Sequence, residues 1–139
     1  SHPPDVLQHH LVQDLLPDVV GGAHLRALLL VGAAGEVVVG GGHGVGPMQY
    51  HKTVQTRSHA RYYPDPCTLT IKLCYQPEDH ILLGAQIMGS KEAACRIDTF
   101  ACAIDQKMST EELGLLDLGY APPFASVWDA IQIAANAAK

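Results

Sequence analysis

The sequence predicts an α+β domain, an antiparallel sheet with flanking helices, over residues 51–139. Two observations carry this prediction: a pair of strand-like runs is separated by turn residues, and helical patterns follow them. Residues 1–50 precede the domain as a poorly specified, low-complexity segment rich in Gly, Val, Leu and His. The chain of 139 residues is long enough for one domain with a hydrophobic core.

The strands are predicted from alternation of apolar and polar residues. Residues 68–75 are TLTIKLCY and residues 81–89 are ILLGAQIMG, with the turn-forming stretch QPED after the first run. This pattern is typical of a β-hairpin. A further strand is expected at residues 53–57.

A long helix is predicted directly after the hairpin, with Ser90 as its N-cap. Apolar residues recur there at spacings of three and four, the period of an amphipathic helix. Cys95 and Cys102 are seven residues apart and share a helix face, so we expect reduced core cysteines. The predicted core face consists of Ala93, Ala94, Ile97, Ala101, Ile104 and Met108.

Two further helices are predicted toward the end of the chain. Residues 109–112, STEE, form a capping box in which the Ser109 side chain accepts from the backbone N–H of Glu112, and they open a short helix with three leucines. The Pro-Pro pair of LDLGYAPPF excludes helix around it. Ser126, with Asp129 three residues later, is expected to cap a final Ala-rich helix.

Residues 1–49 differ in composition from the rest of the chain. They use twelve amino-acid types and carry nine of the 13 glycines. One helix candidate, VLQHHLVQDLL, and one strand candidate at residues 36–39 stand out. We do not expect this segment to fold by itself, and a shifted reading frame or a truncated gene is an alternative to a native, irregular segment.

The glycine-rich stretch EVVVGGGHGVGP at residues 36–47 invites comparison with a dinucleotide-binding turn. The fingerprint G-x-G-x-x-G needs a third glycine, but Val45 or Gln49 stands there in the two registers. No Gly-Lys-Ser/Thr follows the glycines, which excludes a P-loop as well. We therefore expect no nucleotide to bind at this stretch.

Charge and hydropathy exclude several classes of partner. The net charge is −5 and Lys and Arg are scattered singly, which argues against nucleic acid and anionic membranes. The longest apolar run, residues 27–31, is far shorter than the roughly 20 residues that span a bilayer, so we expect a cytoplasmic protein. Neither the cysteines nor the histidines have the spacing of a metal site; the histidines of the first segment are His9, His10, His24 and His43.

Three stretches carry a resemblance to a known family. HARYYPDPCTLTIKL, GAQIMGSKEAACRIDTFACAI and DLGYAPPFASVWDAIQIAAN, in this order, resemble the C-terminal dimerisation domain of FAD-dependent pyridine nucleotide-disulfide oxidoreductases. The chain is most similar to the branch of coenzyme A disulfide reductases, NADH oxidases and NADH peroxidases. Glutathione reductase relatives carry a His-Glu pair in this domain, whereas no histidine follows His80 here.

The resemblance implies a homodimer in which residues of one subunit lie beside the flavin of the other. The family's YYP and YAPP motifs are matched by Tyr62 and Tyr120, with Tyr63 an alternative for the first, and imply catalytic roles in the partner subunit's site. A phenol with a pKa of about 10 can donate a hydrogen bond or a proton to a departing thiolate or a flavin-bound oxygen species. The alternative is that a tyrosine beside a proline packs at the surface.

The resemblance also implies FAD and NAD(P)H for the parent enzyme. The family's flavin-binding fingerprints and redox-active cysteine have no counterpart here, so we expect the chain alone to bind no cofactor and to be inactive. Coenzyme A disulfide, dioxygen and peroxide stay open as substrates, and NADH or NADPH as reductant. Two other hypotheses are an interaction module that self-associates or docks onto a full-length reductase, and a small-molecule binder with an aromatic pocket of Tyr62, Tyr120, Phe124 and Trp128.

Overall fold

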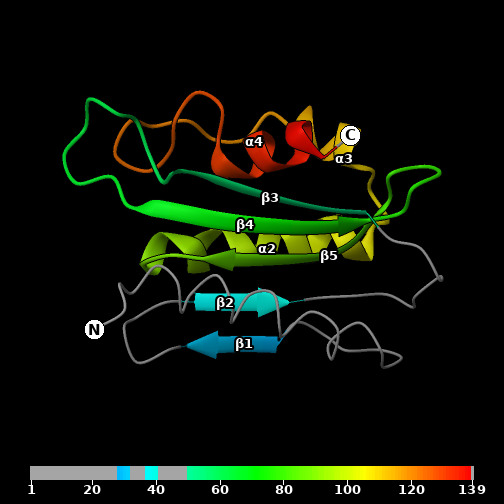
Figure 1. Ribbon diagram of the computed structural model, residues 1–139. Coiled ribbons are helices and arrows are strands. Elements are labelled where there is room, and N and C mark those ends of the chain that lie inside the picture. Colours follow the sequence, from blue (N-terminus) through cyan, green and yellow to red (C-terminus); the bar gives the residue numbers. More distant parts are fainter. Residues whose placement is uncertain (1–27, 32–36, 41–49, 139) are drawn as a thin grey trace.

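The computed structural model describes residues 28–31, 37–40 and 50–138, and Figure 1 shows their α+β arrangement. Its main unit is a sheet of three antiparallel strands followed by helices. Two short strands earlier in the chain pair with each other. In chain order the elements are β1 (Leu28–Val31), β2 (Val37–Gly40), β3 (Tyr50–Arg57), β4 (Thr68–Tyr75), β5 (Leu82–Met88), α2 (Lys91–Asp105), α3 (Thr110–Gly114) and α4 (Ala130–Ala137).

The three-stranded sheet has the order β3-β4-β5, and both pairings are antiparallel. In this register, Ile71 of β4 stands between Val54 of β3 and Ile87 of β5. All residues of β5 are buried, whereas most residues of β3 are exposed. The sheet therefore has its most accessible strand immediately before the loop that carries the YYP motif.

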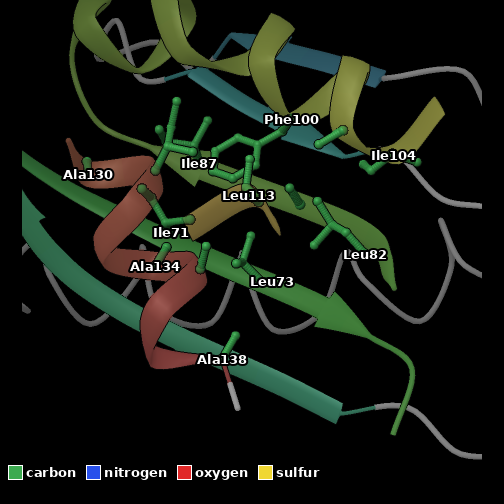
Figure 2. Close-up of a cluster of buried hydrophobic side chains, with 14 of the residues drawn as sticks. Ile71, Leu73, Leu82, Ile87, Phe100, Ile104, Leu113, Ala130, Ala134 and Ala138 are labelled. Atoms are coloured by element: carbon green, nitrogen blue, oxygen red, sulfur yellow. The ribbon is translucent and has the colours of Figure 1, made fainter. Parts of the chain in front are cut away.

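One hydrophobic core joins the sheet to the three helices. Figure 2 shows side chains of β4, β5 and all three helices meeting there, among them Ile71, Phe100 and Leu113. In Figure 1, α4 lies along β3 and β4, and α2 lies along β5. Among the residues whose burial is described, Phe100 is the largest fully buried side chain, so it anchors α2 to the sheet.

The predicted strands are confirmed over residues 50–138, and their bounds are slightly different. The hairpin is formed by β4 and β5, and the third predicted strand is longer than expected, as Tyr50–Arg57. β2 covers the predicted strand at residues 36–39 with a shift of one residue, and β1 is a strand that the sequence analysis misses because its run of apolar residues has no alternation. The predicted helix at residues 6–16 and the four early histidines lie outside the described residues.

The predicted core face of α2 is partly wrong. Phe100 buries far more apolar area than any alanine, so it determines which face of the helix packs against the sheet. The two cysteines predicted to be in the core are turned outward. Buried are Ala93, Arg96, Phe100, Ala103 and Ile104, whereas Ala94, Cys95 and Cys102 are exposed.

The predicted N-cap positions are right for α2 and α3 and wrong for α4. Ser109 and Glu112 form the reciprocal capping box at the start of α3, as predicted. Ser90 occupies the N-cap of α2 as predicted, but its hydroxyl donates to the side chains of Cys67 and Glu92 and accepts no bond from a helix N–H. At α4 the cap is Asp129 itself, and the prediction of Ser126 is wrong because the chain enters the helix three residues later.

Candidate functional site

The two tyrosines predicted as site residues lie together at the surface. The Tyr62 and Tyr120 hydroxyl oxygens are 2.9 Å apart, a hydrogen bond between residues 58 positions apart in the sequence. Tyr62 is 75% exposed and Tyr120 48% exposed. Tyr63 instead packs edge-on against His59, with ring centroids 5.9 Å apart. The geometry therefore brings together Tyr62 and Tyr120, and separates Tyr63 from their hydrogen bond.

Tyr62 belongs to a loop, residues 58–67, that is closed by its own hydrogen bonds. At its base the Ser58 N–H donates to the Cys67 carbonyl at 2.9 Å, and the Cys67 N–H donates to the Ser58 hydroxyl at 3.1 Å. His59 is buried, and its Nε2 lies 2.9 Å from the Pro64 carbonyl. Because a carbonyl only accepts, the proton of that bond is on Nε2. The histidine thus fixes the turn around Tyr62.

Tyr120 belongs to a second loop, between α3 and α4, whose shape is set by its Pro-Pro pair. The N–H groups of Phe124 and Ala125 both donate to the Ala121 carbonyl at 2.9 Å, which makes a tight turn just after Tyr120. The Ala60 N–H donates to the Pro122 carbonyl at 3.3 Å. This backbone contact places the two tyrosine loops against each other.

A buried ion pair lies beneath both loops. Arg96 of α2 donates from Nε and Nη2 to the carboxylate of Asp129, at distances of 2.9–3.2 Å, and each residue is 6% exposed. Nη2 also donates to the Phe124 carbonyl at 3.0 Å and to the Ser58 carbonyl, and Nη1 donates to the Glu92 carbonyl at 2.9 Å. One guanidinium thus bonds to the base of the first loop, the second loop and the cap of α4.

The sequence analysis misses Arg96. Its signal is its position: residues 93, 96, 100 and 103 have the spacing of one helix face, and an arginine on the buried face of a helix requires a partner. Asp129 is the partner, and its role as N-cap of α4 explains why it is buried as well. The ion pair could therefore have been suspected once Phe100 was placed in the core.

The hydrogen bond between the phenols changes the acidity of one of them. It raises the pKa of Tyr62 above its ordinary value of 10.0, mainly because of the bond to Tyr120 and to a smaller extent because of desolvation. The Tyr62 phenol is therefore protonated at neutral pH and able to donate. Either hydroxyl can be the donor of the mutual bond, and the O–H proton of the other is then not used in it.

Two other titratable side chains of the described residues, Cys74 and Glu111, also have shifted pKa values. Burial raises the pKa of the Cys74 thiol to about 11, which leaves it protonated at neutral pH. His80 Nδ1 lies 2.6 Å from Glu111 and holds the pKa of that carboxyl below its ordinary value, which ties the hairpin turn to α3. Within residues 28–31, 37–40 and 50–138, no group of three or more His, Cys, Asp or Glu side chains could hold a metal ion. No described helix is long and apolar enough to cross a bilayer.

Curated proteins similar to this chain are reductases and oxidases. An NADH oxidase of Methanocaldococcus jannaschii is 40% identical over 57% of this chain and 17% of its own length. An NAD(P)H coenzyme A polysulfide/persulfide reductase of Pyrococcus horikoshii is 39% identical over 60% of this chain and 18% of its own length. The chain thus spans about a fifth of the length of these relatives.

Solved structures with the same fold come from the same group of proteins. An NAD-dependent persulfide reductase from A. fulgidus superposes with a TM-score of 0.73 at 27% identity, over 83% of this chain and 22% of that one. Reduced Bacillus anthracis CoADR-RHD superposes with a TM-score of 0.74 at 25% identity, over 94% of this chain and 25% of that one. The family model of the pyridine nucleotide-disulphide oxidoreductase dimerisation domain matches residues 44–131. The chain therefore belongs to the family of pyridine nucleotide-disulphide oxidoreductase dimerisation domains.

Proposed function

We propose that residues 51–139 are the dimerisation domain of a flavin- and NAD(P)H-dependent disulfide reductase or NADH oxidase, and that Tyr62 and Tyr120 act in the partner subunit's active site. The observation that carries the proposal is the exposed hydrogen bond between the two phenols. Two surface tyrosines that merely packed beside prolines would have no reason to share it. The match of the family model to residues 44–131 supports the division of the chain near residue 50.

The pair suits the role of a proton or hydrogen-bond donor. Reduction of a disulfide releases a thiolate, and reduction of oxygen gives a charged oxygen species; each is stabilised by a positioned donor. In the pair, one phenol donates to the other and the second O–H proton is available for the reacting group. The raised pKa of Tyr62 keeps that phenol protonated under physiological conditions.

Flavin and nicotinamide would be held by other parts of such an enzyme. The described residues offer two exposed hydroxyls, which can act as proton donors in such a site. They carry no G-x-G-x-x-G turn that would bind a dinucleotide. When bound, the flavin would supply the transfer of electrons to the substrate. The phenols of this domain would hold and deliver the proton.

The surface around the pair supports self-association as a homodimer. Large apolar and aromatic side chains are exposed on the two tyrosine loops, residues 58–67 and 115–129. Interfaces between subunits are enriched in aromatic residues, and exposed apolar surface often marks such an interface. The group consists of Tyr62, Tyr63, Leu115, Tyr120, Phe124, Val127 and Trp128.

Replacement of either tyrosine by phenylalanine is expected to lower turnover in an assembled enzyme. The test uses a full-length coenzyme A disulfide reductase whose own dimerisation domain is replaced by residues 50–138 of this chain. Tyr62→Phe and Tyr120→Phe should each reduce kcat by about 10²-fold, the low end of what a positioned proton donor contributes. Steady-state kinetics with NADH in excess measures the effect.

Tyr50→Phe is the matched control, because Tyr50 is as exposed as Tyr120 but packs edge-on against Tyr75 and not within the pair. This variant should leave kcat unchanged. Full turnover in both Tyr62→Phe and Tyr120→Phe, in a chimera confirmed to be dimeric, would remove the proposed catalytic role. Equal losses in all three variants would show a general effect on folding and would also count against it.

A further inference from the structure

The most heavily bonded buried side chain of the described domain lies beneath the tyrosine pair and takes no part in it. We propose that Arg96 is a positioning residue: its guanidinium holds the two tyrosine loops at the separation that lets Tyr62 and Tyr120 share a hydrogen bond. An effect of Arg96 on catalysis rests on the proposed function above. Its effect on the distance between the two tyrosines can be tested separately.

The geometry of the contacts carries the proposal. Arg96 Nη2 donates to the Ser58 carbonyl and, at 3.0 Å, to the Phe124 carbonyl. Ser58 stands four residues before Tyr62, and Phe124 stands four residues after Tyr120. A single nitrogen therefore joins one backbone anchor of each tyrosine loop. A direct backbone hydrogen bond between the two loops, from the Ala60 N–H to the Pro122 carbonyl, is longer, at 3.3 Å.

The nitrogen is itself fixed to the rigid part of the domain. Asp129 accepts from both Nε and Nη2 and so sets the plane of the guanidinium. Nη1 donates to the Glu92 carbonyl one turn earlier on α2, which fixes the side chain to its own helix. Phe100 anchors α2 in the core. Arg96 therefore fixes the positions of the two loops relative to the core as well as relative to each other.

A purely structural role explains less of this arrangement. Burying an ion pair is costly, and such a pair can often be replaced by apolar residues without loss of stability. The N-cap role of Asp129 needs an acceptor but no charge, since asparagine caps as well as aspartate. What an apolar replacement cannot do is donate to two carbonyls on different loops. The Nη2 group of the guanidinium supplies this, whereas a lysine side chain is one bond shorter and its ammonium does not reach that position.

Arg96→Lys in the full 139-residue chain is the direct test. Lysine keeps a positive charge for Asp129, but its shorter side chain does not place a donor between the two carbonyls, and it has no second nitrogen for the Glu92 carbonyl. We expect the ring-to-ring nuclear Overhauser contacts between Tyr62 and Tyr120 to be lost, and the Tyr62 phenol to titrate as it does in a Tyr120→Phe reference. Amide exchange in β4 serves as the measure of the fold: slow exchange retained there shows that the core is intact while the loops have changed.

Thr110→Val is the matched control. It removes another buried bond, from the Thr110 hydroxyl to the Ala138 carbonyl at 2.7 Å, which joins α3 to the end of α4 away from the pair. This variant should keep the tyrosine contacts and the wild-type titration of Tyr62. Retention of the pair in Arg96→Lys, or its loss in Thr110→Val, would overturn the proposal.

A second variant covers the case in which Arg96→Lys does not fold. Arg96→Met with Asp129→Asn buries no charge, keeps a cap for α4 and leaves both loop carbonyls without their donor. The same measurements apply, and a persisting tyrosine pair in this variant would overturn the proposal. A dimeric chimera with full activity in both Tyr62→Phe and Tyr120→Phe would instead refute the proposed function and leave the positioning result intact.

Discussion

Replacement of Arg96 by methionine is expected to lower the free energy of unfolding of the domain by about 3–5 kcal/mol. The substitution leaves the Asp129 carboxylate 6% exposed and without its cation, and a buried charge without a partner is strongly destabilising. Urea unfolding followed by circular dichroism at low protein concentration measures the effect.

The double variant Arg96→Met/Asp129→Asn separates the charge effect from the loss of side-chain packing. It removes both charges and should regain most of the stability lost in the single variant, because no uncompensated charge remains. A single variant that loses less than about 1 kcal/mol would mean that water reaches Asp129, contrary to the buried geometry described above. A double variant as unstable as the single one would show that the carbonyl bonds of Arg96, and not its charge, dominate the stability.

Phe100→Ala is expected to cost about 3–5 kcal/mol of unfolding free energy. Phe100 is fully buried at the centre of the cluster in Figure 2, between the sheet and the helices, and its loss leaves a cavity that the surrounding side chains fill incompletely. Phe100→Leu leaves a smaller cavity and should cost clearly less. Equal costs for the two substitutions would contradict the tight packing assigned to this ring.

The sheet and the cap of α3 could be predicted from the sequence because their signals are local. Alternation over eight residues identifies a strand, and the Ser109–Glu112 capping box lies within one turn. The face of α2 could not be predicted correctly from the spacing of small residues. Several alanines and two cysteines outline a stripe, yet the single ring of Phe100 outweighs them in apolar area.

The contact between the two tyrosines could not be predicted from the sequence. The motifs around Tyr62 and Tyr120 could be matched to a family, but no spacing indicates that hydroxyls 58 residues apart meet at 2.9 Å. Their contact depends on Arg96, whose role becomes visible only when Ser58, Phe124 and Asp129 are placed around it. Long-range contacts of this kind are set by the tertiary fold and not by local propensity.

Sedimentation equilibrium of the chain at tens of micromolar tests whether the tyrosine loops face a second subunit. We expect a homodimer, and we expect Phe124→Asp, which places a charge on an exposed position beside the pair, to give a folded monomer. A wild-type chain that sediments as a monomer at this concentration would contradict this expectation, as would a dimer that Phe124→Asp leaves unchanged.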